Sequence, residues 1–511
     1  MKTRVIIIVL CLMSASPVFA DDFYIAQSSA GSANGADCAD ALAVMWLNTS
    51  GNWANPKAAG QIGPGDTVHL CGTISSNLAI QDSGSSGSPI TILFESGANL
   101  SQPFMQGGLQ LNNVSYITVD GGTNGLIQST LNGTSGGACP GGACTYQQTA
   151  QGIWADPCNN CEIRNLTIAN MYVRTSIADE KVDATMVDGI GYLSGSNINI
   201  HNNTIHDSGI GIAHRFSDGD TNINIHDNNI YNVNWGEELS CRETPLAGTI
   251  SFYNNHVHDY ANWDDPVNNY YHHNGIHAFG TCQGAAGGTF IYNNIFDGNP
   301  GLYITGHVFF EQWSPFTTPV YIFNNVFAAS ANNAWVVLYI GGSGSVIANN
   351  SFLNGGLALQ AATNPIIKNN FFYGVSGNDL FQIYQGTVTF ANEVTDLNYN
   401  YYSNCNNTYC WDAGNHNATN VFSTWQTLCA GCDGNSIANL AGNGGVDPRT
   451  YQPVTGSPVL GAGSNLTSLG ITALNSDAGG NPRPSRGAWD IGAYQYTGVP
   501  PAPTGLRLLG N

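Results

Sequence analysis

A short alternation of apolar and polar residues, followed by paired asparagines, recurs through the middle of the chain. The segments are INIHNNTIHD, INIHDNNIYN, ISFYNNHVHD, TFIYNNIFDG, VYIFNNVFAA, SVIANNSFLN and PIIKNNFFYG. From Asn202 to Asn369 the successive pairs lie 26, 26, 39, 31, 25 and 20 residues apart. Alternation of this length is typical of short strands, and a period near 25 residues fits neither TPR nor ankyrin repeats. The pattern predicts an all-β solenoid of stacked coils.

The paired asparagines have a structural role in such a solenoid. Asparagine tolerates the left-handed backbone conformation that a corner between two strands requires. Coils stack about 4.8 Å apart, so equivalent asparagines can also hydrogen-bond from one coil to the next. We therefore interpret these asparagines as scaffold. The histidines that follow the pairs, His206, His256 and His258, are interpreted in the same way, as corner or stacking residues.

The first twenty residues have the form of a secretory leader, with a basic start, an apolar run from Val5 to Met13 and small residues before Ala20. No later stretch has the roughly 18 apolar residues that a membrane span needs. We expect a soluble, monomeric, secreted protein, either extracellular or periplasmic. The net charge of −21 excludes nucleic acid and anionic membranes as favoured partners.

Twelve cysteines follow the leader, and an even number in an exported chain predicts disulfides. Their spacing suggests local pairs and two longer links: Cys139 with Cys144, Cys158 with Cys161, Cys405 with Cys410, Cys429 with Cys432, Cys38 with Cys71, and Cys241 with Cys282. A redox or zinc role for CNNC and CAGC is the alternative.

Three stretches give the chain a resemblance to the secreted right-handed parallel β-helix proteins of the pectate-lyase-like superfamily. They are the opening FYIAQSSAGSANGADCADALAVMW with IGPGDTVHLCGTI, the Asn-paired coils, and the ending GSPVLGAGSNLTSLGITALNSDAGGNPRPSRGAWDIGAYQY. The resemblance implies one single-stranded right-handed parallel β-helix domain over 22–498, capped by a helix near 37–47, with a Pro-rich tail at 499–511. It does not imply one reaction, because the superfamily includes lyases, hydrolases, epimerases and adhesins.

The repeat breaks at two overlong coils. The 39-residue gap holds DYANWDDPVNNYYHHNGIH, and the 31-residue gap holds ITGHVFFEQWSPFTTP. Loops that leave a solenoid tend to build its binding face. If Ile276 and Ala278 point inward, alternation places His273 and His277 on one outward face.

The rare charged residues gather in these coils and their neighbours, and this predicts the site. The candidate catalytic residues are Arg215, Glu237, Glu238, His273, His277 and Glu311. The candidate substrate-binding residues are Trp235, Arg242, Trp263, Asp264, Asp265, Tyr271 and Trp313. Aromatic rings beside carboxylates are typical of sugar-binding sites.

These residues predict an enzyme that cleaves a polysaccharide, with glycoside hydrolysis by paired carboxylates as the favoured reaction. Carboxylates two coils, or about 9.6 Å, apart can approach the roughly 6.5–9.5 Å that inverting hydrolysis uses. One alternative is a lyase acting on a uronic-acid polymer, with Arg215 or His277 as base and Ca²⁺ as the only cofactor suggested. The segment Ser217–Thr221 is a Ca²⁺ loop or an ordinary acidic turn. A non-catalytic carbohydrate-binding protein is the third possibility.

Overall fold

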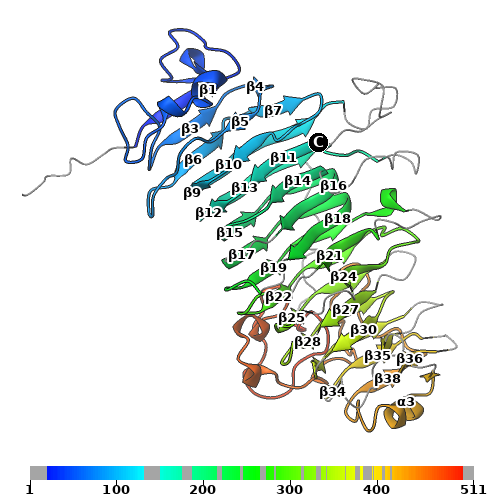
Figure 1. Ribbon diagram of the computed structural model, residues 1–511. Helices are drawn as coiled ribbons and strands as arrows, with labels where there is room; N and C mark the ends of the chain where they lie inside the picture. The colour runs from blue at the N-terminus through cyan, green and yellow to red at the C-terminus, as the bar shows by residue number, and fades with distance from the viewer. Residues whose placement is uncertain are drawn as a thin grey trace, which may run out of the picture.

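The computed structural model is a long stack of parallel strands (Figure 1) and describes most of the chain. The described residues are 20–131, 150–174, 187–215, 221–241, 245–264, 272–280, 284–311, 316–329, 335–340, 342–362, 364–374, 380–383, 394, 396–405, 409–414 and 417–498. The predicted all-β class and the parallel β-helix architecture are confirmed.

Most strands belong to three parallel arrays that run along the length of the stack, neighbouring strands of each array coming from successive coils. We call these arrays files, and within a file each strand pairs in parallel with its equivalents in the neighbouring coils. The first file contains β1 (Asp22–Ala26), β3 (Thr67–Leu70), β6 (Ile90–Phe94), β15 (Ser196–His201), β17 (Thr221–His226), β19 (Ile250–Tyr253), β22 (Thr289–Tyr292), β25 (Val320–Phe323), β28 (Val346–Ala348), β31 (Ile366–Lys368) and β34 (Asp396–Asn398). The second contains β4 (Thr73–Ile74), β7 (Asn99–Gln102), β20 (His256–His258), β23 (Ile295–Asp297), β26 (Val326–Ala328), β29 (Ser351–Leu353), β32 (Phe371–Tyr373), β35 (Tyr401–Ser403) and β38 (Ile437–Asn439).

The third file carries the candidate site. It contains β5 (Leu78–Ala79), β8 (Leu109–Leu111), β11 (Ala150–Ala155), β14 (Val187–Tyr192), β21 (Asn274–Gly280), β24 (Gly306–Phe310), β27 (Val336–Ile340), β30 (Leu357–Ala362), β33 (Phe381–Ile383) and β36 (Trp411–Asp412). Four long strands turn a corner and serve two files: β10 (Ile117–Ser129) and β13 (Glu162–Ala169) join the first to the second, while β16 (Thr204–Arg215) and β18 (Asn229–Cys241) join the second to the third.

A few short elements lie outside the files. They are β2 (Leu42–Ala43), β9 (Val114–Ser115), β12 (Cys158–Asn159), β37 (Ala418–Thr419), η1 (Cys38–Asp40), α1 (Val44–Leu47), η2 (Ser50–Asn52), η5 (Ala261–Trp263), α3 (Phe422–Leu428), η6 (Thr467–Leu469) and η7 (Thr472–Asn475). The helix expected near 37–47 is therefore interrupted. Residues Leu42 and Ala43 pair with β1 as a strand, so only one α-helical turn follows them.

The sequence suggested two roles for the paired asparagines, and the two residues of each pair have one role each. The first residue of a pair is left-handed, with φ near +56° at Asn202, Asn293 and Asn324. The second residue is buried and joins a continuous ladder of Asn203, Asn228, Asn255, Asn294, Asn325, Asn350, Asn370 and Asn400. The second coil uses Asp227 and Asn228, and not the Asn228–Asn229 pair expected from the motif. The scaffold interpretation of the asparagines is confirmed.

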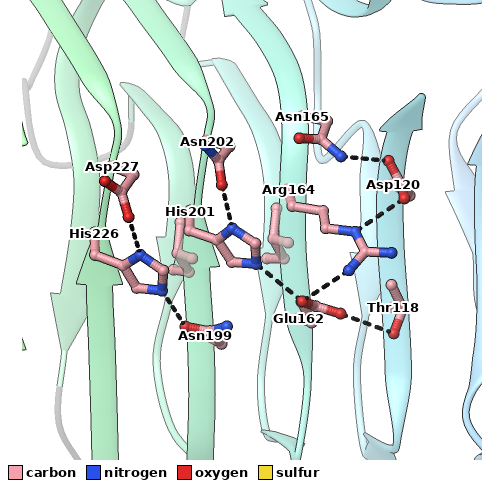
Figure 2. Close-up of polar contacts among 12 residues, drawn as sticks. Thr118, Asp120, Glu162, Arg164, Asn165, Asn199, His201, Asn202, His226 and Asp227 are labelled. Atoms are coloured by element: carbon pink, nitrogen blue, oxygen red, sulfur yellow. Dashed lines mark hydrogen bonds and ion pairs between the residues drawn. The ribbon is translucent and has the colours of Figure 1, made fainter. Parts of the chain in front are cut away.

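Histidine and tyrosine rings stack outside the first and second files. His201 and His226 lie 4.8 Å apart with a 2° angle between their rings. Figure 2 shows their nitrogens in contact with neighbouring side chains: His201 Nε2 lies 2.9 Å from Glu162 Oε1, and His226 Nδ1 lies 2.6 Å from Asp227 Oδ2. The stacking predicted for the repeat histidines is confirmed by ring contacts of His206 and His258 with Tyr231.

The C-terminal segment folds back along the outside of the later coils, where Figure 1 shows it in orange-brown beside β25 and β28. Its contacts are with coils far away in the sequence. Asn349 Nδ2 donates to the Asp490 and Gly492 carbonyls, and Asn369 Nδ2 donates to the Ser464 carbonyl.

Four of the six predicted disulfides are present, namely Cys38–Cys71, Cys158–Cys161, Cys405–Cys410 and Cys429–Cys432. Both short CxxC pairs therefore form disulfides in the structure. The pair Cys139/Cys144 lies outside the described residues, as do Cys282 and the side chain of Cys241. None of the helices in the described part of the chain is long and apolar enough to cross a membrane.

Candidate functional site

The candidate site lies on the outer face of the third file. A register row of Ile212, Glu237 and Ile276 alternates with a row of Ala213, Glu238 and His277. Ile212 and Ile276 belong to the apolar core, so the first row points inward and the second outward. We call the outward row, with its flanking outward side chains, the outward strip.

The two adjacent glutamates therefore lie on opposite sides of the sheet. Glu237 is fully buried, and neither of its carboxyl oxygens has a hydrogen-bond partner in the structure. Burial raises the pKa of Glu237 well above its ordinary value, and the nearby charge of Glu238 adds to this. The Glu237 carboxyl faces the core, where burial favours its neutral form. Glu238, and not Glu237, lies on the outward strip.

Arg215 bridges two acidic side chains on the outward strip. Its Nη2 lies 2.8 Å from Glu238 Oε2, and its Nη1 lies 3.0 Å from Asp188 Oδ2. Burial raises the pKa of both carboxyls, and that of Glu238 reaches about 7 although Arg215 opposes the shift. Desolvation lowers the pKa of Arg215, but the two carboxylates raise it by more, so the guanidinium stays charged.

Asp188 was not found from the sequence. It lies in a coil that precedes the first Asn pair, so the repeat gave no register for it. A series of glycines in successive coils could have supplied a register for Asp188. Gly189, Gly211, Gly236 and Gly275 stack in successive coils, where a Cβ would lie 2.5–2.7 Å from a backbone oxygen of the next coil. Aligning these glycines places Asp188 directly before the first of them.

His277 lies one coil beyond Glu238 on the same row. Its Nε2 lies 3.1 Å from Glu311 Oε1, and its ring meets Trp235 edge-on at 4.4 Å. Burial lowers the pKa of His277, and the interaction with Glu311 offsets only part of that shift. Burial raises the pKa of Glu311, but His277 lowers it by more, so this carboxyl is ionised at neutral pH.

His273 is separated from His277 by its backbone conformation. Both His272 and His273 have positive φ, +63° and +24°, so strand alternation cannot be extended back past Asn274. The His273 ring is completely buried, and its Nε2 lies 2.9 Å from Asp264 Oδ1. The exposed face predicted for His273 is therefore wrong, and His277, although it lies on the outward row, is itself buried.

Trp263 ends the short helix η5, and Asp264 follows it. We call this segment, which lies beside the outward strip, the ledge. Asp264 accepts hydrogen bonds from the backbone amides of Leu302 and Tyr303, which fasten one loop to another. Trp263 is buried against Tyr172, and the Arg174 guanidinium lies 5.3 Å from its ring centre. These contacts give both residues a structural role in the ledge.

The structure thus brings together Arg215, Trp235, Glu238, His277 and Glu311 from the predicted set. Their chemical roles stay predictions. Arg242, Asp265, Tyr271 and Trp313 lie outside the described residues, as does most of the segment Ser217–Thr221.

No protein-family model and no curated protein sequence matches the chain. Several solved structures are similar in fold, including the three that follow. The pectate lyase Pel9A is 12% identical, with a TM-score of 0.42, and the match covers 94% of this chain and 97% of that one. XylC in complex with xylose is 13% identical, with a TM-score of 0.47, over 93% and 98% of the two chains. A mannuronic-acid-specific family 6 polysaccharide lyase from human gut microbiota is 13% identical, with a TM-score of 0.37, over 75% and 81%. At these identities the likeness concerns the fold alone.

Proposed function

We propose that the protein cleaves a polysaccharide by glycoside hydrolysis, with Glu238 as general acid and Glu311 as general base. One observation carries the proposal: three successive coils bring Glu238, His277 and Glu311 together, with one carboxyl titrating near pH 7 and the other ionised there. Carboxyls whose surroundings drive their pKa values apart are the usual arrangement for paired acid and base catalysis.

The spacing supports an inverting reaction. Glu238 and Glu311 come from coils two steps apart, which separates their backbones by about 9.6 Å. Arg215 holds Glu238 on the side away from Glu311. A separation of this order leaves room for the water that Glu311 would activate, because inverting enzymes hold their carboxyls roughly 6.5–9.5 Å apart.

The other residues have supporting roles in this proposal. His277 holds Glu311 in place and can relay a proton, since a neutral imidazole can both donate and accept. Arg215 fixes the orientation of Glu238, and the buried Trp235 packs edge-on against His277. Four disulfides are typical of a protein that works outside the cytoplasm, where polysaccharides are met.

A lyase reaction is the second candidate, and the neutral state of His277 favours it. A neutral imidazole can remove the proton that β-elimination requires. Arg215 is a poor base, because its two carboxylates keep it protonated. This reaction would need a cation such as Ca²⁺ to neutralise the uronate in a strip that already holds Asp188, Glu238 and Glu311.

Product analysis separates the candidates. The purified chain is incubated with neutral glycans, pectin, alginate and glycosaminoglycans, with and without Ca²⁺. Hydrolysis yields reducing ends alone, elimination yields ends that absorb in the ultraviolet, and a binding protein yields neither. We expect reducing ends without ultraviolet absorbance, and unsaturated ends would replace the hydrolase proposal with the lyase.

Variants then test the residues. We expect Glu238→Gln and His277→Ala to lower kcat by about 10²–10⁴-fold, the range that general acid–base groups contribute. Glu162→Gln is the matched control, because that carboxyl lies on the first file, away from the strip. Thermal melting of each variant checks folding. Full activity in folded Glu238→Gln protein would refute the assignment.

A further inference from the structure

The outward strip continues from the candidate site toward the N-terminus. Register rows place Gln110 beside Trp154, Trp154 beside Gly191, and Gly191 beside Ala213, which in turn neighbours Glu238. Trp154 and Gln110 thus share one outward row with the proposed acid. Trp154 lies three coil-to-coil steps from Glu238, which is about 14 Å along the stack.

A cavity of about 370 Å³ opens at this end of the strip, lined by Gln106, Gly107, Gln110, Ala150 and Gln151. The volume lies within the range of small-ligand sites. The cavity is linked to the acidic cluster, because Gln151 Nε2 donates to Asp188 Oδ2 over 3.3 Å. Asp188 in turn binds Arg215, which holds Glu238.

Glycines shape both parts of this region. A Cβ on Gly191 would lie 2.7 Å from Trp154 Cε3, so the indole packs directly over Gly191. A Cβ on Gly107 would lie 2.9 Å from Gln110 Nε2, so that amide lies across Gly107, whose φ of +74° also favours glycine. Trp154, Gln110 and Gln151 are each half-buried. Gln110 and Gln151 line the cavity, and Trp154 is the register neighbour of Gln110.

We propose that Trp154, Gln110 and Gln151 form a binding subsite for an uncharged sugar, and that the substrate is a neutral polysaccharide lying along the coils from Trp154 to Glu238. The inference rests on the proposed function. Amide side chains both donate to and accept from sugar hydroxyls, and an indole ring packs on the apolar face of a pyranose.

The charge of the region decides the class of sugar. The five described residues that line the cavity carry no charged side chain, and one of them, Gln151, contacts the carboxyl of Asp188. Among the described residues no cation lines the cavity to pair with a uronic acid, and the nearby Arg215 is already paired with Asp188 and Glu238. A neutral sugar loses nothing by this arrangement, so the subsite selects against acidic polymers.

Binding is measured with Glu238→Gln protein, so that turnover does not interfere. The probes are neutral gluco-, xylo- and manno-oligosaccharides, each as a disaccharide and a hexasaccharide, and oligogalacturonates serve as the charged comparison. The binding affinity of each probe is measured by calorimetry. We expect a neutral hexasaccharide to bind more tightly than its disaccharide and than the charged series. Trp154→Ala and Gln110→Ala should each weaken hexasaccharide binding about 2- to 12-fold, the effect of losing one ring contact or one hydrogen bond.

Gln128→Ala is the control, since its amide contacts Ser101 on the second file, away from the strip. Gln110→Ala keeps the test decisive if Trp154→Ala does not fold. Unchanged hexasaccharide binding in folded Trp154→Ala or Gln110→Ala, tighter binding of oligogalacturonates, or no binding of any neutral hexasaccharide would overturn the subsite. The proposed hydrolysis is judged separately, by the turnover lost in Glu238→Gln.

Discussion

Neighbouring residues of one chemical type have opposite environments on the two faces of β18. Glu237 faces the apolar core, while Glu238 faces Arg215 and Asp188 on the outward strip. Burial raises both pKa values, but only Glu238 has a cation that pulls its pKa back to about 7. Strand alternation thus gives one glutamate a structural environment and the other an environment suited to proton transfer.

The pKa of Glu238 predicts the alkaline limit of activity. A general acid must be protonated, so kcat/KM should fall as pH rises through about 7. Arg215 lowers the pKa of Glu238, and Arg215→Gln should therefore move this limit to higher pH. The measurement is the pH profile of kcat/KM for both proteins, with Arg164→Gln on the first file as control. A limit that stays in place or moves to lower pH contradicts the assignment.

Glu237 predicts a pH-dependent loss of stability. Its folded pKa lies well above the unfolded value, so its contribution is fully favourable below the unfolded pKa and is lost as pH rises. Glu237→Gln cannot ionise at this position, so its free energy of unfolding should rise relative to that of the wild type between pH 4 and pH 7. Urea unfolding at both pH values tests this, with the half-buried Glu162→Gln as comparison. If the free energies of unfolding of the wild type and of Glu237→Gln change with pH in parallel, the Glu237 carboxyl is solvated and the prediction is wrong.

Composition and alternation predicted part of the site. Arg215, Glu238, His277 and Glu311 were recognisable because charged residues are scarce and these four fall in neighbouring coils. Alternation could not choose between two adjacent glutamates, because the strand register depends on pairing with the next coil.

Asp188 and His273 show where that reasoning fails. Asp188 lies before the repeats, and His273 follows a residue of positive φ, where strand periodicity has not yet begun. Local backbone geometry of this kind leaves no periodic trace in the sequence.

At the scale of the elements, the asparagine ladder connects every coil from Asn203 to Asn400. Asn294 shows the pattern: its Oδ1 accepts from the backbone N and the Nδ2 of Asn255, and its Nδ2 donates to the Phe252 carbonyl and to Asn325 Oδ1. Each ladder residue therefore satisfies buried groups of both neighbouring coils.

Asn294→Ala should destabilise the protein by at least about 2 kcal/mol, because it leaves several buried donors and acceptors without partners. Chemical denaturation measures the loss. Asn224→Ala is the control, since this half-buried residue lies outside the ladder, on the outer face of β17. Equal and small effects of the two substitutions would mean that the ladder does not stabilise the stack.

The repeated elements were predictable because each coil must satisfy the same geometric requirement. A left-handed corner and a buried amide recur at one position, and the sequence therefore repeats. The ladder ends at Asn400, where Tyr399 occupies the left-handed position, so the paired-asparagine motif did not reveal this coil. The capping segment was only partly predictable, because the pairing of Leu42–Ala43 with β1 overrides local helix preference.

At the scale of the whole molecule, the C-terminal segment spans several successive coils and so joins coils that are not direct neighbours, such as those of Asn324 and Asn369. In a solenoid each coil contacts only its neighbours, so stability is passed along the stack step by step. The segment from Val446 to Ala493 departs from this rule. It contacts the coils of Asn324, Asn349 and Asn369 together and covers apolar rings such as Phe371. It therefore acts as a lengthwise brace over the second half of the stack.

Arg483 is the residue on which this brace most depends. Its guanidinium is buried, donates to Asn324 Oδ1 and to the Gly492 and Ala493 carbonyls, and lies 5.5 Å from the Trp489 ring centre. Desolvation lowers its pKa to about 10, so it is charged at neutral pH.

Arg483→Ala should loosen the C-terminal segment while the first coils stay intact, because those coils make no contact with Arg483 and nearest-neighbour coupling confines the effect. Hydrogen exchange, read by peptide, should rise over 446–498 and over the later coils that this segment covers, but not over β3 to β11. Arg449→Ala is the control, since that side chain is 86% exposed and pairs with Asp447 nearby. Uniformly faster exchange along the whole stack would instead show that the solenoid unfolds as one cooperative unit, with the C-terminal segment as an integral part of it.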